Sequence, residues 1–199
     1  MKILLTGFEP FDGGSSNPSY ACLKGLPPTG RRGGACDHGS TPVSFRRAPE
    51  QLLERMKVER PDGVICLGLA ASRAKISLEK VGLNYAHARI PDNDGVQPWD
   101  LLLDPAGPAA YFSTLPVLSL AEALNREGIP AEVSLTAGAY VCNCLLYRLL
   151  AVAGTMPAGF IHVPGTEKMA LETMTQAVMQ IVAFLATERR KRGNHAIPF

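Results

Sequence analysis

The sequence lacks a long apolar run, because none of its hydrophobic stretches approaches the roughly 20 residues that a membrane-spanning helix needs. The apolar start at residues 1–5 is too short for the core of a secretory signal, and Thr6-Gly7 ends it. An excess of one charge is also missing, since the formal net charge is +2 and the basic run 189–192 contains no aromatic residue. We therefore expect a cytoplasmic protein that binds neither membranes nor nucleic acid.

The five cysteines include no Cys-x-x-Cys pair. Cys36-Asp-His38 and Cys142-Asn-Cys144 contain metal-ligating residue types, but neither has a second pair at the spacing of a zinc site. The glycine-rich stretch 7–14 matches neither a P-loop nor a dinucleotide-binding fingerprint. The sequence therefore predicts no metal site and reduced thiols, which are typical of the cytosol.

Apolar strand-like segments alternate with helical segments along the 199 residues, a length that fits one domain with its own core. Strands are expected at 2–6, 41–45, 64–67, 111–114, 131–135 and 159–163. Helices are expected to begin at Pro18, Ala48, Pro116 and close to Cys142, and to cover 171–185. This alternation predicts a single α/β domain over residues 1–199, with a twisted, mostly parallel sheet and helices on both faces.

Three segments have no such periodicity. Residues 27–40 are rich in glycine, proline and arginine and predict a flexible loop, and residues 190–199 predict a frayed tail. Residues 88–108 are nearly all turn formers. An irregular segment of that length inside a compact domain usually has a function, so we interpret it as a functional loop.

Cys142 occupies a position that favours a reactive thiolate. The residues before it alternate like a half-buried strand, those after it repeat at helical spacing, and Gly138 allows a turn between them. Cys142 is therefore expected at or near a helix N-terminus, where free N–H groups and the helix dipole favour the charged thiol. We expect the pKa of this thiol to lie below the ordinary value of about 8.5.

A cysteine nucleophile needs a base, and the base needs an acceptor that orients it. His162 ends an apolar strand at the edge of the sheet where the Cys142 turn is expected, which makes it the candidate base. The acid stays open between Glu79, Asp92 and Asp94. Glu79 falls where the apolar alternation of its segment shifts by one residue, so it either pairs with a surface lysine or points inward to hold a base.

Several groups of residues occur in one order along the chain. They are Thr6-Gly-Phe-Glu-Pro-Phe-Asp-Gly13 with Asn17-Pro18, Ser77-Leu-Glu79-Lys-Val, Ala88-Arg-Ile-Pro-Asp-Asn93 with Gln97-Pro98, Gly107-Pro-Ala-Ala-Tyr111 with Leu115-Pro116, Thr136-Ala-Gly with Val141-Cys-Asn143, and Gly159-Phe-Ile-His162-Val-Pro164. Together they resemble the pyroglutamyl peptidase I (pyrrolidone-carboxylate peptidase) family of cysteine peptidases. The resemblance extends from residue 2 to about residue 186.

The resemblance implies roles for individual residues. Catalytic positions of the family fall on Cys142 (nucleophile), His162 (general base), Glu79 (third triad member) and Arg89 (close to the catalytic centre). Substrate-binding positions fall on Phe8 and Phe11, which match aromatic residues that bracket the pyroglutamyl ring, and on Asn17 of the same pocket. The resemblance also implies a mixed sheet, no cofactor, and a cytosolic homotetramer that acts on peptides with N-terminal pyroglutamate.

The activity implied is that of an omega peptidase, in which a thiolate attacks the pyroglutamyl carbonyl and a thioester is then hydrolysed. Leu69 and Ala71-Ser72 depart from the family pattern, since many bacterial members have glutamine and Gly-Gly there. Leucine cannot hydrogen-bond the lactam, so two alternatives stay open: a relative that binds a small lactam or acid without cleaving it, and a different cysteine amidase. Cys144 replaces a polar residue, and it would form a disulfide with Cys142 only if the local geometry allowed it.

Overall fold

The main sheet of the computed structural model, which describes residues 1–26 and 36–194, has six strands. Their spatial order is β2 (Cys36–Thr41), β1 (Ile3–Phe8), β3 (Gly63–Leu69), β8 (Ala158–Val163), β4 (Ile76–Glu79) and β7 (Ala131–Ser134). The first four strands in this order run parallel, whereas β4 is antiparallel to β8 and parallel to β7. The expected mostly parallel, mixed sheet is confirmed.

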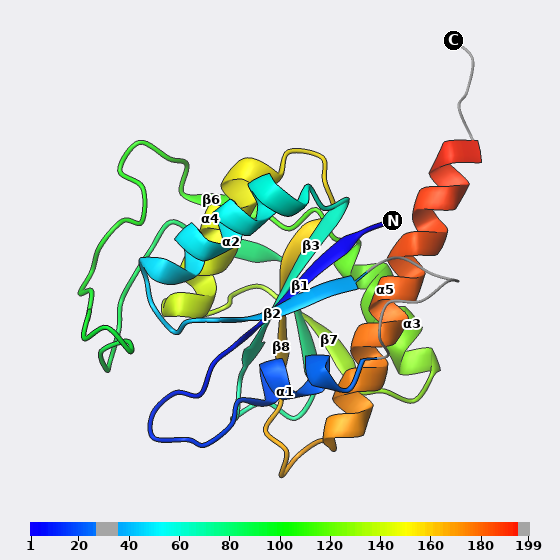
Figure 1. Ribbon diagram of the computed structural model, residues 1–199, viewed down its shortest axis with the longest axis horizontal. Coiled ribbons are helices and arrows are strands. Elements are labelled where there is room, and N and C mark those ends of the chain that lie inside the picture. The colour runs from blue at the N-terminus through cyan, green and yellow to red at the C-terminus, as the bar shows by residue number, and fades with distance from the viewer. Residues whose placement is uncertain (27–35, 195–199) are drawn as a thin grey trace.

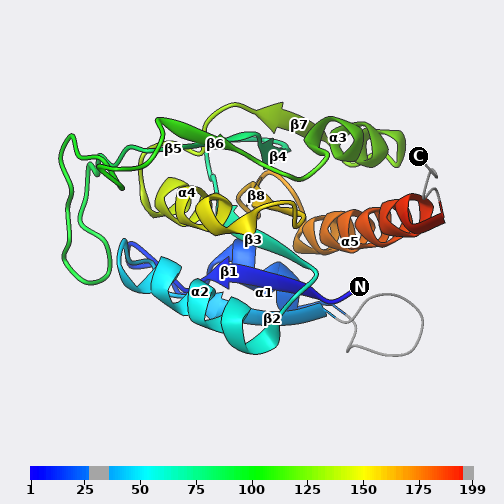
Figure 2. The same ribbon diagram turned by 90° about the horizontal axis from the view of Figure 1, so that it is seen from above.

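Helices cover both faces of this sheet (Figures 1 and 2). One face packs against α1 (Pro18–Lys24), α3 (Val117–Arg126) and α5 (Leu171–Asn194), and the other against α2 (Arg47–Glu59) and α4 (Val141–Ala153). The apolar residues expected to point inward from α3 and α5 are buried, as the 3.6-residue period predicts, except for Leu171 at the start of α5, which is partly buried. The single α/β domain with two helical layers is confirmed. Within the described ranges, no helix combines the length and apolarity that crossing a membrane requires.

The shift in alternation after Glu79 marks the point where the chain changes sheets. Strand β5 (Val81–Leu83) leaves the main sheet and pairs antiparallel with β6 (Ala110–Phe112) in a separate two-stranded sheet. Gly82 allows this small sheet to lie close against α4, because a Cβ atom there would come within 3.1 Å of the Tyr147 backbone. Residues 84–109, which join β5 to β6, form a long irregular segment that extends away from the body of the molecule (Figures 1 and 2).

The prediction of a strand at 41–45 is wrong. The strand is β2, which pairs with β1 along its whole length from Ile3↔Cys36 to Phe8↔Thr41. Pro42 follows directly and has no N–H with which to extend the ladder. Residues 36–40 of the expected flexible loop 27–40 are therefore a strand, while residues 27–35 lie outside the described part of the chain.

The helical end of the chain is longer than expected. Helix α5 continues to Asn194, so the expected tail at 190–199 begins as helix, and residues 195–199 lie outside the described range. Two apolar residues expected to be inside are exposed: Leu135 lies one residue beyond the end of β7, and Val152 lies on the outer side of α4. A regular period alone does not tell where an element ends or how wide its buried face is.

Candidate active site

A tight turn delivers Cys142 to the start of helix α4. Gly138 has φ +82°, a conformation that suits glycine, and Tyr140 is the extended residue that precedes the helix. Cys142 is the second residue of the helix, as the sequence predicts. The first N–H groups of a helix have no acceptor within it, so this end of α4 presents hydrogen-bond donors beside the sulfur.

Gly68 allows the start of α4 to approach the sheet closely. A Cβ atom at Gly68 would lie 3.0 Å from Cys142 Sγ and 2.7 Å from Phe160 Cζ. In the ladder between β3 and β8, the Cα partner of Gly68 is His162. The sulfur of Cys142 therefore lies over strand β3, directly beside the strand position that carries the predicted base.

Glu79 contacts His162 across the antiparallel pair β4–β8. In this register Ser77 lies opposite His162 and Glu79 lies opposite Phe160, so Glu79 and His162 are diagonal neighbours on one face. His162 Nδ1 and Glu79 Oε1 are 2.7 Å apart, and the Glu79 side chain is fully buried. The alternative in which Glu79 pairs with a surface lysine is thereby excluded.

The other two carboxylates lie elsewhere. Asp92 accepts hydrogen bonds from three backbone N–H groups, and Asp94 forms an ion pair with Arg47. Neither has a hydrogen bond or ion pair to His162 among the described residues. Of the three candidate acids, the structure brings only Glu79 to the imidazole.

Arg73 is a part of this cluster that the sequence reasoning missed. Its Nη1 donates to Glu79 Oε1 at 2.6 Å, and its Nη2 donates to the backbone oxygen of Thr136 at 3.0 Å. Arg89, the arginine singled out from the sequence, is exposed and has no hydrogen bond or ion pair to any described residue. One feature of the sequence could have indicated Arg73. It is a cation in the turn directly before the strand that ends with Glu79.

The protonation states favour a charged acid and a neutral thiol. Burial alone would raise the pKa of Glu79, but its interactions with His162, Ser134 and Arg73 outweigh this effect and hold that pKa below the ordinary range. Burial, followed by the nearby Glu79 and Cys66, raises the pKa of Cys142 to about 12. The prediction of a lowered thiol pKa is therefore wrong for the resting protein, because desolvation exceeds the effect of the helix terminus.

A pocket of about 340 Å³ opens beside Cys142. Its apolar lining consists of Phe8, Phe11, Val43, Leu69, Tyr140 and Val141. Phe11 packs against the Tyr140 ring at 5.5 Å, whereas Phe8 is almost completely buried and also packs on Phe160 in the core. The pocket thus contains both predicted phenylalanines, together with the leucine that departs from the family pattern.

Asn17 lines the same pocket, but its side chain is engaged in holding helix α1. Its Oδ1 accepts hydrogen bonds from the N–H and the hydroxyl of Ser19, and its Nδ2 donates to the backbone oxygen of Glu9 at 3.0 Å. Asn17 is therefore the N-cap of α1, directly before Pro18, where the helix was expected to begin. Only one N–H of the amide is left for another contact.

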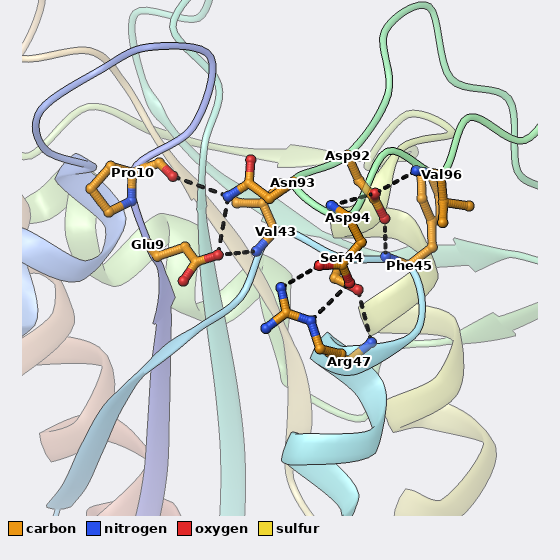
Figure 3. A network of polar contacts seen from close by, with 10 residues as sticks. All are labelled: Glu9, Pro10, Val43, Ser44, Phe45, Arg47, Asp92, Asn93, Asp94 and Val96. Atoms are coloured by element: carbon orange, nitrogen blue, oxygen red, sulfur yellow. Dashed lines mark hydrogen bonds and ion pairs between the residues drawn. The ribbon is translucent and has the colours of Figure 1, made fainter.

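A polar network ties the loop 91–96 to the wall of the pocket (Figure 3). Glu9 Oε1 accepts hydrogen bonds from Val43 N at 3.2 Å and Asn93 Nδ2 at 3.0 Å. The buried carboxylate of Asp92 accepts from the N–H groups of Phe45, Asp94 and Val96. In addition, the Tyr140 hydroxyl donates to the backbone oxygen of Pro91 at 2.9 Å. The aromatic wall is therefore fixed by the segment that was interpreted as a functional loop.

The second cysteine of helix α4 is outside the pocket. Cys144 is buried, and its thiol lies 3.4 Å from the backbone oxygen of Phe45. Cys142 and Cys144 are both free thiols. The described part of the chain contains no group of three or more residues arranged to hold a metal ion. The chemistry that this site offers is nucleophilic attack by a thiol beside an imidazole–carboxylate pair.

Comparison with known proteins agrees with this chemistry. The sequence profile of the pyroglutamyl peptidase family matches residues 1–187. The chain belongs to the pyroglutamyl peptidase family. It is 43% identical to the pyrrolidone-carboxylate peptidase of Gloeobacter violaceus, over 93% of this chain and 92% of that one. It is 42% identical to pyrrolidone-carboxylate peptidase 1 of Caldanaerobacter subterraneus, over 91% of each chain.

Solved structures of pyroglutamyl peptidases have the same fold. Pyroglutamyl peptidase I of Bacillus amyloliquefaciens aligns with a TM-score of 0.86 and 38% identity, over 93% of this chain and 94% of that one. The pyrrolidone carboxyl peptidase of Thermococcus litoralis aligns with a TM-score of 0.90 and 33% identity, over 100% and 98%. The similarity to the pyroglutamyl peptidases therefore spans nearly the whole chain, including the strands and the helix that carry Glu79, Cys142 and His162.

Proposed function

We propose that this protein is a cysteine exopeptidase that hydrolyses the amide bond after an N-terminal pyroglutamyl residue. The observation that carries this proposal is the placement of Cys142 in the lining of an apolar pocket, beside a His162–Glu79 pair. The pyroglutamyl group is a neutral lactam. The mostly aromatic and aliphatic lining of the pocket suits such a group, and the one carboxylate in the lining, Asp12, belongs to an exposed residue.

The first step uses His162 as a general base, because the thiol of Cys142 is neutral at rest. His162 takes the thiol proton as the sulfur attacks the pyroglutamyl carbonyl carbon, and Glu79 stabilises the imidazolium through Nδ1–H. The carbonyl oxygen becomes an oxyanion and is stabilised by backbone N–H groups at the start of α4. In this proposal, Arg89 lies near the acyl group.

The second half of the reaction releases the products. His162 returns its proton to the leaving amine, which departs as the shortened peptide and leaves a thioester on Cys142. Water, deprotonated by His162, then attacks the thioester and releases pyroglutamate. The reaction needs no redox change.

Phe8, Phe11 and Asn17 hold the substrate ring in this proposal. The two phenylalanines supply apolar contact area, and Asn17 contributes the remaining N–H of its amide. An acyl group without the lactam oxygen leaves that donor unpaired, which discriminates against proline.

Cleavage of a pyroglutamyl amide with a fluorescent leaving amine tests the proposal. The Cys142→Ser variant should lose roughly a thousandfold or more of the activity, because the hydroxyl is a much weaker nucleophile. Cys144→Ser, two residues along the same helix and outside the pocket, should retain it. Full activity of Cys142→Ser would rule out the thiol mechanism. Absence of turnover in the wild type, together with thermal stabilisation by pyroglutamate, would indicate a binding protein instead.

We further propose that the protein is a cytoplasmic homotetramer, as the resemblance implies. Support for a reducing location is that Cys22, Cys66, Cys142 and Cys144 are free thiols. Support for self-association is the loop 84–109, which carries the exposed apolar residues Ile90, Val96, Trp99, Leu101 and Leu102.

A further inference from the structure

The guanidinium of Arg73 connects two elements of the proposed active site. Arg73 lies in the turn between β3 and β4, and its backbone N–H donates to Ala70 O at 2.9 Å. One of its side-chain nitrogens donates to Glu79 at 2.6 Å and another to the backbone oxygen of Thr136 at 3.0 Å. Only 27% of the Arg73 side chain is exposed, and Glu79 is not exposed at all.

Thr136 belongs to the connection that delivers the nucleophile. It lies between β7 and α4, and its backbone oxygen also accepts a hydrogen bond from the hydroxyl of Ser134. Its own hydroxyl accepts from the N–H of Gly138, the residue with positive φ in the turn before Cys142. Arg73 therefore links the carboxylate that orients the imidazole to the turn that positions the thiol.

The carboxylate of Glu79 has few hydrogen-bond partners. Its Oε1 accepts from both His162 and Arg73, whereas its Oε2 is buried without a hydrogen-bond partner among the described residues. A buried negative charge of this kind disfavours a thiolate close to it and favours a cation close to it. Arg73 is the fixed cation that offsets this charge, and it shares Oε1 with the imidazole.

We propose, on the basis of the function proposed above, that Arg73 is a positioning residue. It compensates the charge of Glu79 and connects Glu79 to the turn before Cys142 through hydrogen bonds. The ionisable groups that face the cluster come from four strands or turns: Cys66 from β3, Glu79 from β4, His162 from β8, and Arg73 itself. Among the described residues, the side-chain hydrogen bonds of Arg73 go to Glu79 and Thr136, through which it acts, and its charge also opposes the rise in the pKa of the Cys142 thiol.

Removal of the charge should change the pH dependence of the reaction. In Arg73→Met the negative charge of Glu79 is no longer offset by a cation. This charge then stabilises the imidazolium of His162 and opposes formation of the Cys142 thiolate. The acidic limb of the kcat/KM profile should therefore move to higher pH, and alkylation of Cys142 by iodoacetamide at pH 8 should become several-fold slower. We expect kcat/KM at pH 7 to fall roughly tenfold to a hundredfold, as when a charge-assisted hydrogen bond that lowers the barrier is lost.

Two further variants separate charge from geometry. Arg73→Lys keeps the cation but lacks the planar fork that reaches two acceptors. It should restore the acidic limb to its wild-type position while kcat stays reduced. Lys75→Met is the matched control, because Lys75 is a cation in the same turn that pairs with the exposed Glu132 at 3.6 Å. It should leave both the profile and the alkylation rate unchanged.

The outcomes distinguish this proposal from the proposed function. An acidic limb and an alkylation rate that do not move in Arg73→Met, while the protein stays folded, would overturn the positioning role. A shift of the same size in Lys75→Met would overturn it as well. If Arg73→Met does not fold, Arg73→Lys provides the test instead. An acidic limb of its kcat/KM profile that is displaced from the wild-type position would contradict the positioning role. Alkylation is measured without substrate, so it reports on Arg73 even if the wild type does not cleave the reporter.

Discussion

Cys142 carries a neutral thiol at rest because this partly buried residue packs over Gly68, where desolvation and the charge of Glu79 raise the pKa of its thiol. The start of helix α4 offers N–H groups, but they do not replace the water that burial removes. The thiolate and the imidazolium then form only during the reaction, when His162 accepts the proton as the sulfur attacks. In this respect the site behaves like a serine nucleophile with a histidine base rather than like a preformed thiolate–imidazolium pair.

The alkylation of Cys142 by iodoacetamide tests this protonation state. Because burial raises the pKa of the thiol to about 12, the rate in the absence of substrate should rise about tenfold per pH unit beyond pH 9. The rate is followed by mass spectrometry of the peptide that contains residue 142, with Cys142→Ser as the blank. A rate that is already constant below pH 8 would show that the thiolate forms at rest.

Glu79→Gln should reduce kcat/KM by about a thousandfold or more, by analogy with the loss of an orienting carboxylate in a catalytic triad. A glutamine amide donates to Nδ1 and leaves the imidazole proton on Nε2, so His162 no longer accepts the thiol proton. Steady-state kinetics with the pyroglutamyl reporter measure this effect, and Glu132→Gln on the exposed side of β7 is the control. Activity within tenfold of the wild type would contradict the role of Glu79.

The same variant gives a prediction on stability. The pKa of Glu79 is lowered in the folded protein, so its charge stabilises the fold above the unfolded pKa, and this contribution is lost as the pH falls through the folded pKa. The difference in unfolding free energy between wild type and Glu79→Gln should therefore be largest near pH 6 and shrink toward pH 3. Urea unfolding at a series of pH values measures it, and a difference that grows in acid would contradict the assignment.

At the scale of elements, the distance between helix α4 and the sheet depends on Gly68. An alanine there would place its Cβ 2.7 Å from the Phe160 ring and 3.0 Å from the sulfur, so one of the two has to move. We expect Gly68→Ala to destabilise the protein by roughly 1–3 kcal/mol and to lower kcat. Thermal unfolding and kinetics of the purified variant check both effects. An unchanged kcat would show that the helix can retreat from β3 without consequence.

The loop 91–96 holds the aromatic wall of the pocket through Asp92. Asp92→Ala leaves three backbone N–H groups without their acceptor. The wall around Tyr140 should then loosen, which raises KM for the reporter roughly tenfold and changes kcat little. Arg47→Met, which removes only the exposed ion pair with Asp94, is the control and should change KM little. Equal effects of the two variants would contradict a specific role of Asp92.

Local patterns predicted much of the architecture, because each apolar segment had a clear period and was bounded by residues that favour turns or helix ends. The strand that carries His162, the turn at Gly138 and the cap at Asn17 were all predictable in this way. Strand β2 was not, since Cys36–Thr41 is a polar edge strand without an apolar alternation and is specified only by its pairing with β1.

The partners of the site were harder to predict than its elements. The contact between Glu79 and His162 depends on the reversal of β4 relative to β8, which is a property of the tertiary fold. Arg73 was missed for the same reason, because its two acceptors lie on different elements. The raised pKa of Cys142 follows from burial, which a sequence pattern does not quantify.

At the scale of the whole molecule, the exposed loop 84–109 provides a spectroscopic test of association. Trp99 is the only tryptophan in the sequence, and 70% of it is exposed in the single chain. If subunits cover this loop, its emission should shift to shorter wavelength as the concentration rises, in step with the mass from analytical ultracentrifugation. Leu102→Glu should keep both signals at their dilute values. A monomer with unchanged emission at every concentration would rule out the tetramer.

Peroxide reacts with thiolates far faster than with thiols. A nucleophile that stays protonated until an acyl group arrives therefore escapes conversion to sulfenic acid while the pocket is empty. The burial that makes Cys142 a poor anion also protects it, so the protein should tolerate brief oxidative stress that inactivates enzymes with a resting thiolate.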